Sequence, residues 1–380
     1  MPDVNPKKAS LDPVVNCAEC MKTIPSSEAY DPEGTDDAMC FCGRECYEAW
    51  RRGVARKVAV PTGGRLMSPP GGMPGVRGVH GGHHHFGWDN SLAPVLRVAP
   101  GETVELAALE ASGGRITPAS RHADVLTLDA EHANPVTGPL WIEGAAPGDA
   151  LVVDVLEFAL SGWGWTAIIP GFGLLAEDFT APCLHLSSYD DRRVEFTPEI
   201  HLPTRPFAGT LGVAPAEPGR HSAIPPRSVG GNLDCRDIVA GARLWLPVAV
   251  PGALFSLGDT HAAQGDGEVC GTAVETPLTV RLRFDLAKDA RLRAPRLELP
   301  AAAAPPPPSG QAVTFGIGAD LHAAARDAVR AMIDLLGAEY RLCPELAYCV
   351  CSVAVHLRIS ELVNAPNWVV AAYLPRGIFR

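Results

Sequence analysis

Glycine and proline interrupt this chain so often that long helices can occupy only a small part of it. The 38 glycines and 36 prolines make up close to a fifth of the 380 residues, and both residue types favour turns over helices. The clearest strand is the segment 278–286 (LTVRLRFDL), in which apolar and polar residues alternate. Such alternation is typical of an antiparallel strand with one buried face. We therefore expect short strands joined by turns through most of the chain.

Helical periodicity is clearest in the C-terminal part of the sequence. Residues 320–337 predict a helix that Asp320 caps and that Gly337 ends. A second helix is expected over about 344–358. The expected strands come first along the chain and the expected helices come last. This order indicates an α+β, β-rich protein with a β-sandwich core and a C-terminal helical part. The expected buried face of the first helix consists of Leu321, Ala325, Val329, Met332, Ile333 and Leu336.

The N-terminal segment carries a cysteine pattern typical of a structural zinc site. Its two cysteine pairs, separated by 21 residues, are Cys17 with Cys20 and Cys42 with Cys46. Four thiolates at this spacing suit tetrahedral zinc, and so small a segment needs a metal to stabilise it. The prediction is a treble-clef-like, four-cysteine zinc finger over 1–57, a Gly- and Pro-rich linker over 58–83 and the main domain over 84–380. The alternative for 1–57 is a reduced, disordered Cys-rich tail.

Charge and terminal composition argue against nucleic-acid and membrane partners. The net charge of −11 disfavours binding to anionic surfaces. Residues 1–57 contain ten acids against eight bases, unlike a nucleic-acid-binding finger. No apolar stretch reaches the length of a membrane span, and the N-terminus lacks the apolar core of a signal peptide. These features predict a cytoplasmic protein.

Lysine is so scarce that it limits the possible hydrolytic mechanisms. Beyond residue 57 the only lysine is Lys288, in the charged turn LAKDARLR. Ser-Ser-Lys amidases and nitrilase-type Cys-Glu-Lys enzymes both need an active-site lysine, so both fit poorly. The sequence also lacks a G-x-S-x-G elbow and a Walker loop. Metal-assisted chemistry is the remaining option.

Three polar segments contain side chains that could converge on a metal ion. They are GDTHAAQGDGE (258–268), GGNLDCRD (230–237) and the histidine run HGGHHH (80–85). Imidazole and carboxylate groups build catalytic zinc sites, and such a metal supplies hydroxide near neutral pH without a lysine. Each segment also has a structural interpretation, as a glycine-rich turn or as a flexible tract that binds metal adventitiously.

Several long motifs follow one another in order along the chain. They include HFGWDNSLAPVLRVAPGETVEL from residue 85, GGNLDCRDIVAGARLWLPVAVPGALFSLGDTHAAQGDGEVCGTAVET from residue 230 and HLRISELVNAPNWVVAAYLP from residue 356. Together they resemble the acetamidase/formamidase family over about 84–378. The resemblance implies a β-rich fold, a homo-oligomer and metal-dependent hydrolysis of small amides to carboxylate and ammonia. It also implies that the Pro-rich stretch 301–310 is a loop inside the domain, whereas its composition alone suggests a linker.

The resemblance implies a ligand set for the catalytic metal, which we expect to be a divalent ion and most simply zinc. The family's histidine before the Gly-aromatic-Asp segment falls at His85, or at His84 if the gap is placed differently. The other two implied ligands are Asp234 and His261. Glycines around these residues would let the backbone bend closely round a small polar pocket.

The same motifs imply the remaining catalytic and substrate-binding residues. Glu268 is expected to act as general base or as a fourth ligand, and Asp266 to orient that base or His261. Asn232 or Gln264 would hold the substrate amide. Glu143 is a further candidate catalytic carboxylate.

These residues predict an amidohydrolase that acts on carbon–nitrogen bonds other than peptide bonds. The expected substrate is a small linear amide such as formamide or acetamide, with a cyclic imide or another amide as the alternative. A hypothesis from a different class is a non-catalytic protein that binds a small ligand and uses its zinc finger for protein contacts. The complete HAAQGDGE motif argues against it, because a binding relic has little need for every acid.

Overall fold

The computed structural model contains two compact units, Met1–Leu66 and Met67–Arg380. In the first unit, β1 (Val14–Asn16) pairs with β2 (Thr23–Pro25), which leads into a short 3-10 helix, η1 (Ser26–Glu28). The zinc finger stays a prediction, because its four cysteines lie outside the described residues: Cys17, Cys20, Cys42 and Cys46. The residues that the structure describes are 14–16, 23–28, 44, 45, 48, 76–80, 82–299 and 310–379.

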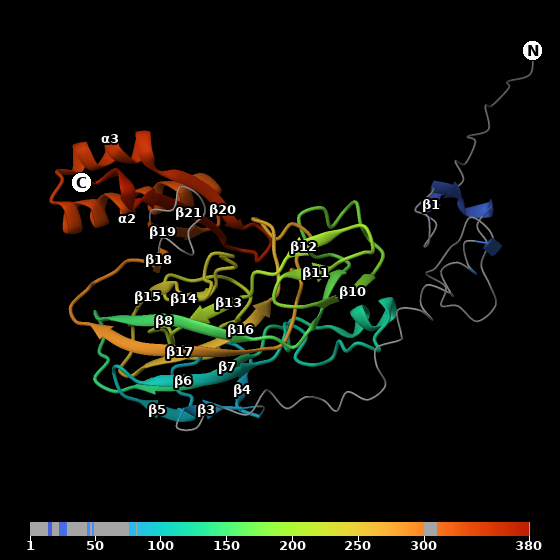
Figure 1. Cartoon of the computed structure of the whole chain (residues 1–380), viewed down its shortest axis with the longest axis horizontal. Helices are drawn as coiled ribbons and strands as arrows, with labels where there is room; N and C mark the ends of the chain where they lie inside the picture. The colour runs from blue at the N-terminus through green and yellow to red at the C-terminus, as the bar shows by residue number, and fades with distance from the viewer. Residues whose placement is uncertain are drawn as a thin grey trace, which may run out of the picture. The chain divides into compact units, whose positions relative to one another are not determined.

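The second unit contains a large, predominantly antiparallel sheet (Figure 1). Its nine strands are β3 (Arg77–Val79), β6 (Thr103–Ala108), β8 (Ala150–Ala159), β15 (Arg243–Pro247), β17 (Leu278–Ala287), β18 (Arg296–Leu299), β19 (Gln311–Gly318), β20 (His356–Glu361) and β21 (Trp368–Pro375). Their order across the sheet is β20-β21-β19-β18-β15-β8-β17-β6-β3. Within it, β3 and β6 are the parallel pair.

A second sheet of six strands carries Asp259 and His261, at the centre of the candidate site. Its strands are β4 (His84–His85), β5 (Leu96–Val98), β7 (Val136–Ile142), β13 (Phe207–Gly212), β14 (Gly230–Asn232) and β16 (Ala253–His261). Five of them follow the order β14-β13-β16-β7-β4, and β5 pairs with β7. A smaller sheet contains β9 (Trp163–Ile168), β10 (Cys183–Tyr189), β11 (Arg193–Glu195) and β12 (His201–Pro203), and a short 3-10 helix, η2, covers His122–Thr127.

Side chains from both large sheets form one hydrophobic core. On β17, Val280, Leu282 and Phe284 are buried whereas Arg283 is exposed, so the predicted alternation is confirmed. Phe284 meets Phe255 of the six-stranded sheet with the ring centroids 5.0 Å apart. Burial of one such side chain contributes about 1.5–3 kcal/mol. The predicted β-sandwich core is therefore confirmed.

Two helices, α2 (Leu321–Tyr340) and α3 (Pro344–Ala354), pack at the β19 and β21 end of the nine-stranded sheet (Figure 1). The side chain of Asp320 caps α2, as predicted. The helix continues past Gly337 instead of ending there. The second helix is shorter than predicted, because the residues from His356 onward pair with β21 as strand β20.

The buried face of α2 is displaced from the predicted one by about one residue. Ala324 and Ala328 are fully buried, whereas Val329 and Ile333 are only partly buried. The reason lies on β19, where the helix backbone packs directly against Gly316: a Cβ there would collide with the carbonyl oxygen of Ala324. The smallest side chains of the helix therefore face the sheet.

Segment boundaries differ from the prediction at one place and agree at another. Arg77–Val79, predicted as part of the linker 58–83, forms β3, because Val79 is buried in the main core and the strand pairs with β6. Strands β18 and β19 pair with each other, so the stretch 301–310 joins neighbours within one sheet.

The last described element is η3 (Arg376–Ile378). Among the residues described, no helix has both the length and the apolar composition needed to cross a membrane.

Candidate active site

The end of strand β16 supplies the centre of a buried polar cluster. Asp259 and His261 are two residues apart on this strand, so their side chains leave it on the same face. Asp234 follows β14, which reaches β16 through the shared neighbour β13. Glu268 and Glu275 lie in the chain beyond β16. All five side chains are buried.

His261 lies between the carboxylates of this cluster. Its Nε2 atom is 3.2 Å from Asp259 Oδ1, 3.2 Å from Glu275 Oε2 and 4.0 Å from Glu268 Oε1. Two groups offer ligand atoms that all lie within 4.8 Å of one another: Asp234, His261 and Glu268 form the first, and Asp259, His261 and Glu275 the second. The two predicted ligands Asp234 and His261 therefore do come together, with Glu268 beside them.

Gly209 on β13 provides the space in which these groups meet. A Cβ at this position would collide with Asp234 Oδ1 and would lie 2.9 Å from both Asp259 Oδ2 and His261 Cε1. The Gly209 carbonyl also accepts the backbone N–H of Asp234 at 3.2 Å. Glycine is thus required here by close approach, since any side chain would fill the centre of the cluster.

Three of the acids adopt a strained backbone conformation. The φ angle is +42° at Asp234, +53° at Asp259 and +47° at Glu268. Residues other than glycine rarely adopt this left-handed region. Such strain persists where the surrounding structure imposes it, and it concentrates at functional sites. The conformation therefore supports a functional role for the cluster.

The cluster has an excess of buried negative charge. Four carboxylates surround one imidazole, and in the part of the chain that the structure describes none of the four forms an ion pair with lysine or arginine. The nearby buried Asp237 differs, because Arg205 and Arg358 neutralise it at 2.5 and 2.7 Å. Buried carboxylates without a cationic partner are costly. A bound cation would remove that cost.

Burial and mutual repulsion change the ionisation of these groups. Burial, reinforced by Asp259, raises the pKa of Asp234 well above its usual value, and burial with repulsion from Asp234 does the same to the pKa of Glu268. Burial raises the pKa of Glu275 to about 7. Burial alone would lower the pKa of His261, but Glu275 and Asp259 raise it well above its ordinary value. Without a metal, the cluster therefore retains protons near neutral pH.

The end of β20 and the turn that follows it add two residues, Glu361 and Asn364, that were not predicted from the sequence. Asn364 Nδ2 donates to Asp234 Oδ2 at 2.6 Å. Glu361 is fully buried, and its Oε1 accepts the backbone N–H groups of Val363 and Asn364. Burial raises the pKa of Glu361 to about 7. A signal was present: Glu361 in ISELV and Glu275 in TAVET are acids within largely apolar stretches, where an exposed position is not expected.

The structure does not bring His85 into the cluster. On β4, His85 pairs with Val136 of β7, and the other edge of β7 pairs with β16. Two strand spacings, roughly 10 Å, therefore separate β4 from β16. The His85 Nδ1 atom lies 2.7 Å from Gly87 O, and Nε2 lies 2.9 Å from Ser256 Oγ. The alternative ligand, His84, is exposed, and its ring contacts the ring of Phe86 with the centroids 5.6 Å apart.

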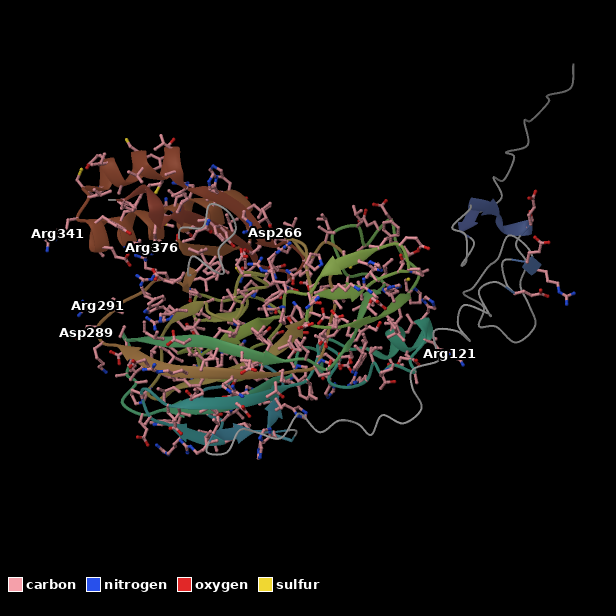
Figure 2. The ribbon with its side chains drawn as sticks, in the orientation of Figure 1. Arg121, Asp266, Asp289, Arg291, Arg341 and Arg376 are labelled. Atoms are coloured by element: carbon pink, nitrogen blue, oxygen red, sulfur yellow. The ribbon has the colours of Figure 1, made fainter. Side chains whose placement is uncertain are left out.

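Two of the predicted catalytic carboxylates also lie apart from the cluster. Glu143 is exposed just beyond the end of β7. Asp266 is bound by Arg358 through hydrogen bonds of 2.7 and 2.9 Å, and among the described residues no hydrogen bond joins it to His261 or Glu268. Figure 2 shows Asp266 at the boundary between the C-terminal elements and the middle of the chain.

The two predicted substrate-binding residues lie beside the cluster. Asn232 Oδ1 accepts a hydrogen bond of 2.5 Å from Thr210 Oγ1, which also lies 3.5 Å from Asp259 Oδ2. Gln264 Nε2 donates to the backbone oxygen of Asp234 at 2.9 Å. Its Oε1 is buried and has no hydrogen-bond partner among the described residues. Gln264 is therefore the better placed of the two to accept a hydrogen bond from a ligand.

Comparison with known proteins identifies the family. Residues 79–222 and 219–380 match the Acetamidase/Formamidase family, and the chain belongs to this family. Residues 8–68 match a domain of unknown function (DUF3330).

Relatives and solved structures agree with this assignment. The formamidase of Methylophilus methylotrophus is 28% identical over 268 residues, covering 55% of this chain and 65% of that protein. The acetamidase of Mycolicibacterium smegmatis is 29% identical over 270 residues, covering 54% and 66%. The crystal structure of an acetamidase from Bacillus halodurans superimposes with a TM-score of 0.72 at 30% identity, covering 80% of this chain and 98% of that one. The chain thus spans just under two thirds of the length of the two curated relatives.

Proposed function

We propose that this chain hydrolyses small linear amides, such as formamide or acetamide, to a carboxylate and ammonia, and that it uses a divalent metal to do so. The observation that carries the proposal is the cluster of buried carboxylates around His261, which no lysine or arginine of the described residues neutralises. The similarity to proteins named formamidase and acetamidase supports the substrate class.

The residues at the centre of the cluster fit a divalent metal. Asp234 Oδ1 and His261 Nδ1 are buried and have no hydrogen-bond partner among the described residues. With Glu268 they offer two carboxylates and one imidazole, which are oxygen and nitrogen donors that a divalent cation such as zinc accepts. We therefore assign Asp234, His261 and Glu268 as the ligands, with zinc as the first candidate.

A divalent cation at this position would make water acidic enough to supply hydroxide near neutral pH and would polarise the amide carbonyl. The surrounding side chains then have two tasks. Glu275, whose Oε2 lies 3.2 Å from His261 Nε2, can accept a proton at Oε2 and return it to the leaving nitrogen. Gln264 Oε1 can accept a hydrogen bond from the amide N–H of the substrate, because Gln264 Nε2 is already fixed by Asp234 O.

The test is ammonia release from a panel of small amides before and after removal of metal by a chelator. We expect chelation to abolish hydrolysis and re-addition of zinc to restore it. The double variant Cys17→Ser/Cys42→Ser separates the two proposed zinc sites, because it should lose one zinc per chain and retain hydrolysis. Unchanged activity in the chelated protein would exclude the metal-dependent mechanism.

The Gly209→Ala variant tests the position of the metal without removing any ligand. Its Cβ would push apart Asp234 and His261, and misplacement of reacting groups by about 1 Å costs on the order of 10²-fold in rate. We expect a loss of about 10² in kcat/KM together with weaker zinc binding. Gly318→Ala is the matched control, because a Cβ at Gly318 meets nothing within 4 Å. Equal activity of both variants would place the reaction elsewhere.

A further inference from the structure

Strand β20 contacts both chain segments that carry the assigned ligands. From β20, Arg358 binds Asp266 through three hydrogen bonds, from Nη2 to Oδ1 and Oδ2 at 2.7 Å each and from Nε to Oδ2 at 2.9 Å. The third nitrogen, Nη1, donates to Asp237 Oδ2 at 2.7 Å. Two residues along the strand, the carbonyl of Ser360 accepts the backbone N–H of Gly267 at 3.0 Å. One short strand therefore holds the 264–268 and 232–237 segments together.

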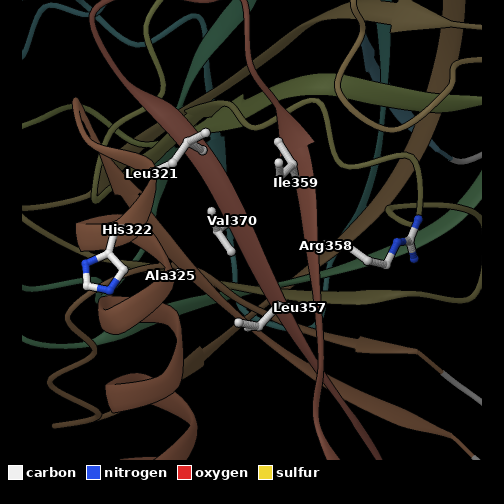
Figure 3. Close-up of a pocket in the computed structure, with 7 residues that line it drawn as sticks. All are labelled: Leu321, His322, Ala325, Leu357, Arg358, Ile359 and Val370. Carbon is white, nitrogen blue, oxygen red and sulfur yellow. The ribbon is translucent and has the colours of Figure 1, made fainter.

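The guanidinium of Arg358 is fixed in this position by its surroundings. It lies over the ring of Tyr373, 4.5 Å from the centroid, and the Tyr373 hydroxyl donates to Asp237 Oδ2 at 2.7 Å. Arg358 borders an apolar groove together with Leu357 and Ile359, and Figure 3 shows that its guanidinium is directed away from these two side chains. A planar fork with donors on two sides can join two carboxylates in a fixed geometry, which a lysine ammonium cannot.

We infer that Arg358 is a positioning residue of the active site, which holds Glu268 and Asp234 at the separation that the metal requires. It acts through Asp266, two residues before Glu268, and through Asp237, three residues after Asp234. This inference rests on the proposed metal-dependent function and extends it to a residue of the C-terminal strand.

Loss of Arg358 should loosen both segments without removing a ligand. Asp266 is 38% exposed in its side chain and can return to water, whereas Asp237 keeps Arg205 as a partner. The loosened ligands should bind metal more weakly by about 10–100-fold, the usual effect of removing a group that orients metal ligands.

The experiment compares Arg358→Ala and Arg358→Lys with Arg376→Ala in the full chain. Arg376 is a matched control: both arginines are 26% exposed, both bind two carboxylates, and both lie in the C-terminal elements. Arg376 lies well away from Asp266 in Figure 2. Zinc affinity is measured by competition with a chromophoric chelator, kcat/KM by ammonia release, and folding by thermal unfolding. Guanidinium ion is added to the Arg358→Ala protein to replace the missing group.

We expect about 10–100-fold weaker zinc binding and a similar loss in kcat/KM for both Arg358 variants. Guanidinium should partly restore Arg358→Ala, and Arg376→Ala should stay within about twofold of wild type. Zinc affinity and kcat/KM of Arg358→Ala within twofold of wild type, or an equal loss in Arg376→Ala, would overturn the inference. A wild-type chain that binds zinc without hydrolysing amides would refute the proposed function, while zinc affinity would still decide the role of Arg358. A wild-type chain with neither property would overturn both.

Discussion

Replacing His261 with alanine should reduce kcat/KM for acetamide by at least about 10⁴-fold, the scale on which loss of a central catalytic group acts. His261 supplies the only imidazole in both candidate ligand groups. Its removal takes away a metal ligand and leaves the surrounding carboxylates with no positive partner among the described residues. Ammonia release and zinc content per chain are the two measurements, and both should fall together.

Two further variants separate loss of the metal from loss of the fold. Asp234→Asn keeps the shape of the side chain and an oxygen that can accept from Asn364 Nδ2, so it should fold normally and still lose zinc and activity. His85→Ala removes the ligand that the sequence predicted and the structure places two strands away. The His85→Ala variant should lose about 1 kcal/mol of stability, because the hydrogen bond between His85 Nε2 and Ser256 Oγ is removed. Its kcat/KM should change by less than about threefold. Comparable losses in the His85 and His261 variants would contradict the assigned ligand set.

The sequence was sufficient for features whose signals are local. The alternation on β17 and the cap at Asp320 depend on residues close together in the chain, and both were predicted. Asp234, His261 and Glu268 were also available from the sequence, because each belongs to a compact motif with flanking glycines. The buried face of α2 differs from the predicted face because Gly316, on strand β19, lets the helix backbone pack directly against the sheet.

Features that depend on strand order could not be read from the sequence. His85 lies in a histidine run that suggests a metal, but β7 lies between its strand and β16. Asn364 reaches Asp234 across 130 residues of chain. Asn364 and Glu361 reach the cluster because β20 lies next to the 264–268 segment. Strand β20 is the edge strand of the nine-stranded sheet, not of the six-stranded sheet. Pairings of this range depend on the whole fold, which no local pattern encodes.

The metal-free protein should lose stability as the pH rises from about 4.5 to about 7. Glu275 and Glu361 have a pKa of about 7 in the folded chain, raised from an ordinary 4.5 by burial. Above pH 4.5 the unfolded chain releases these protons while the folded chain still holds them, so each rise in pH favours unfolding. The two shifts together weaken folding by several kcal/mol, about 3 kcal/mol for each carboxyl. The raised pKa of His261 acts in the same direction, because its contribution is lost above its ordinary pKa of 6.5.

Bound metal should reverse this pH dependence, because a cation stabilises the ionised carboxylates that burial disfavours. The measurement is the urea midpoint of the chelated protein at pH 5, 6, 7 and 8, with and without added zinc. Asp234, Glu268 and Glu110, whose pKa values burial also raises, act in the same direction as Glu275 and Glu361. The buried Asp237 does not oppose them in this pH range. Arg205 and Arg358 lower the pKa of Asp237 despite its burial, so its contribution is complete above its ordinary pKa of 3.8. Glu275→Gln should remove the part of the fall that Glu275 contributes in the metal-free protein, about 3 kcal/mol. If the chelated wild type gained stability from pH 5 to pH 8, the carboxylates would have to be neutralised within the chain, and the cluster would need no metal.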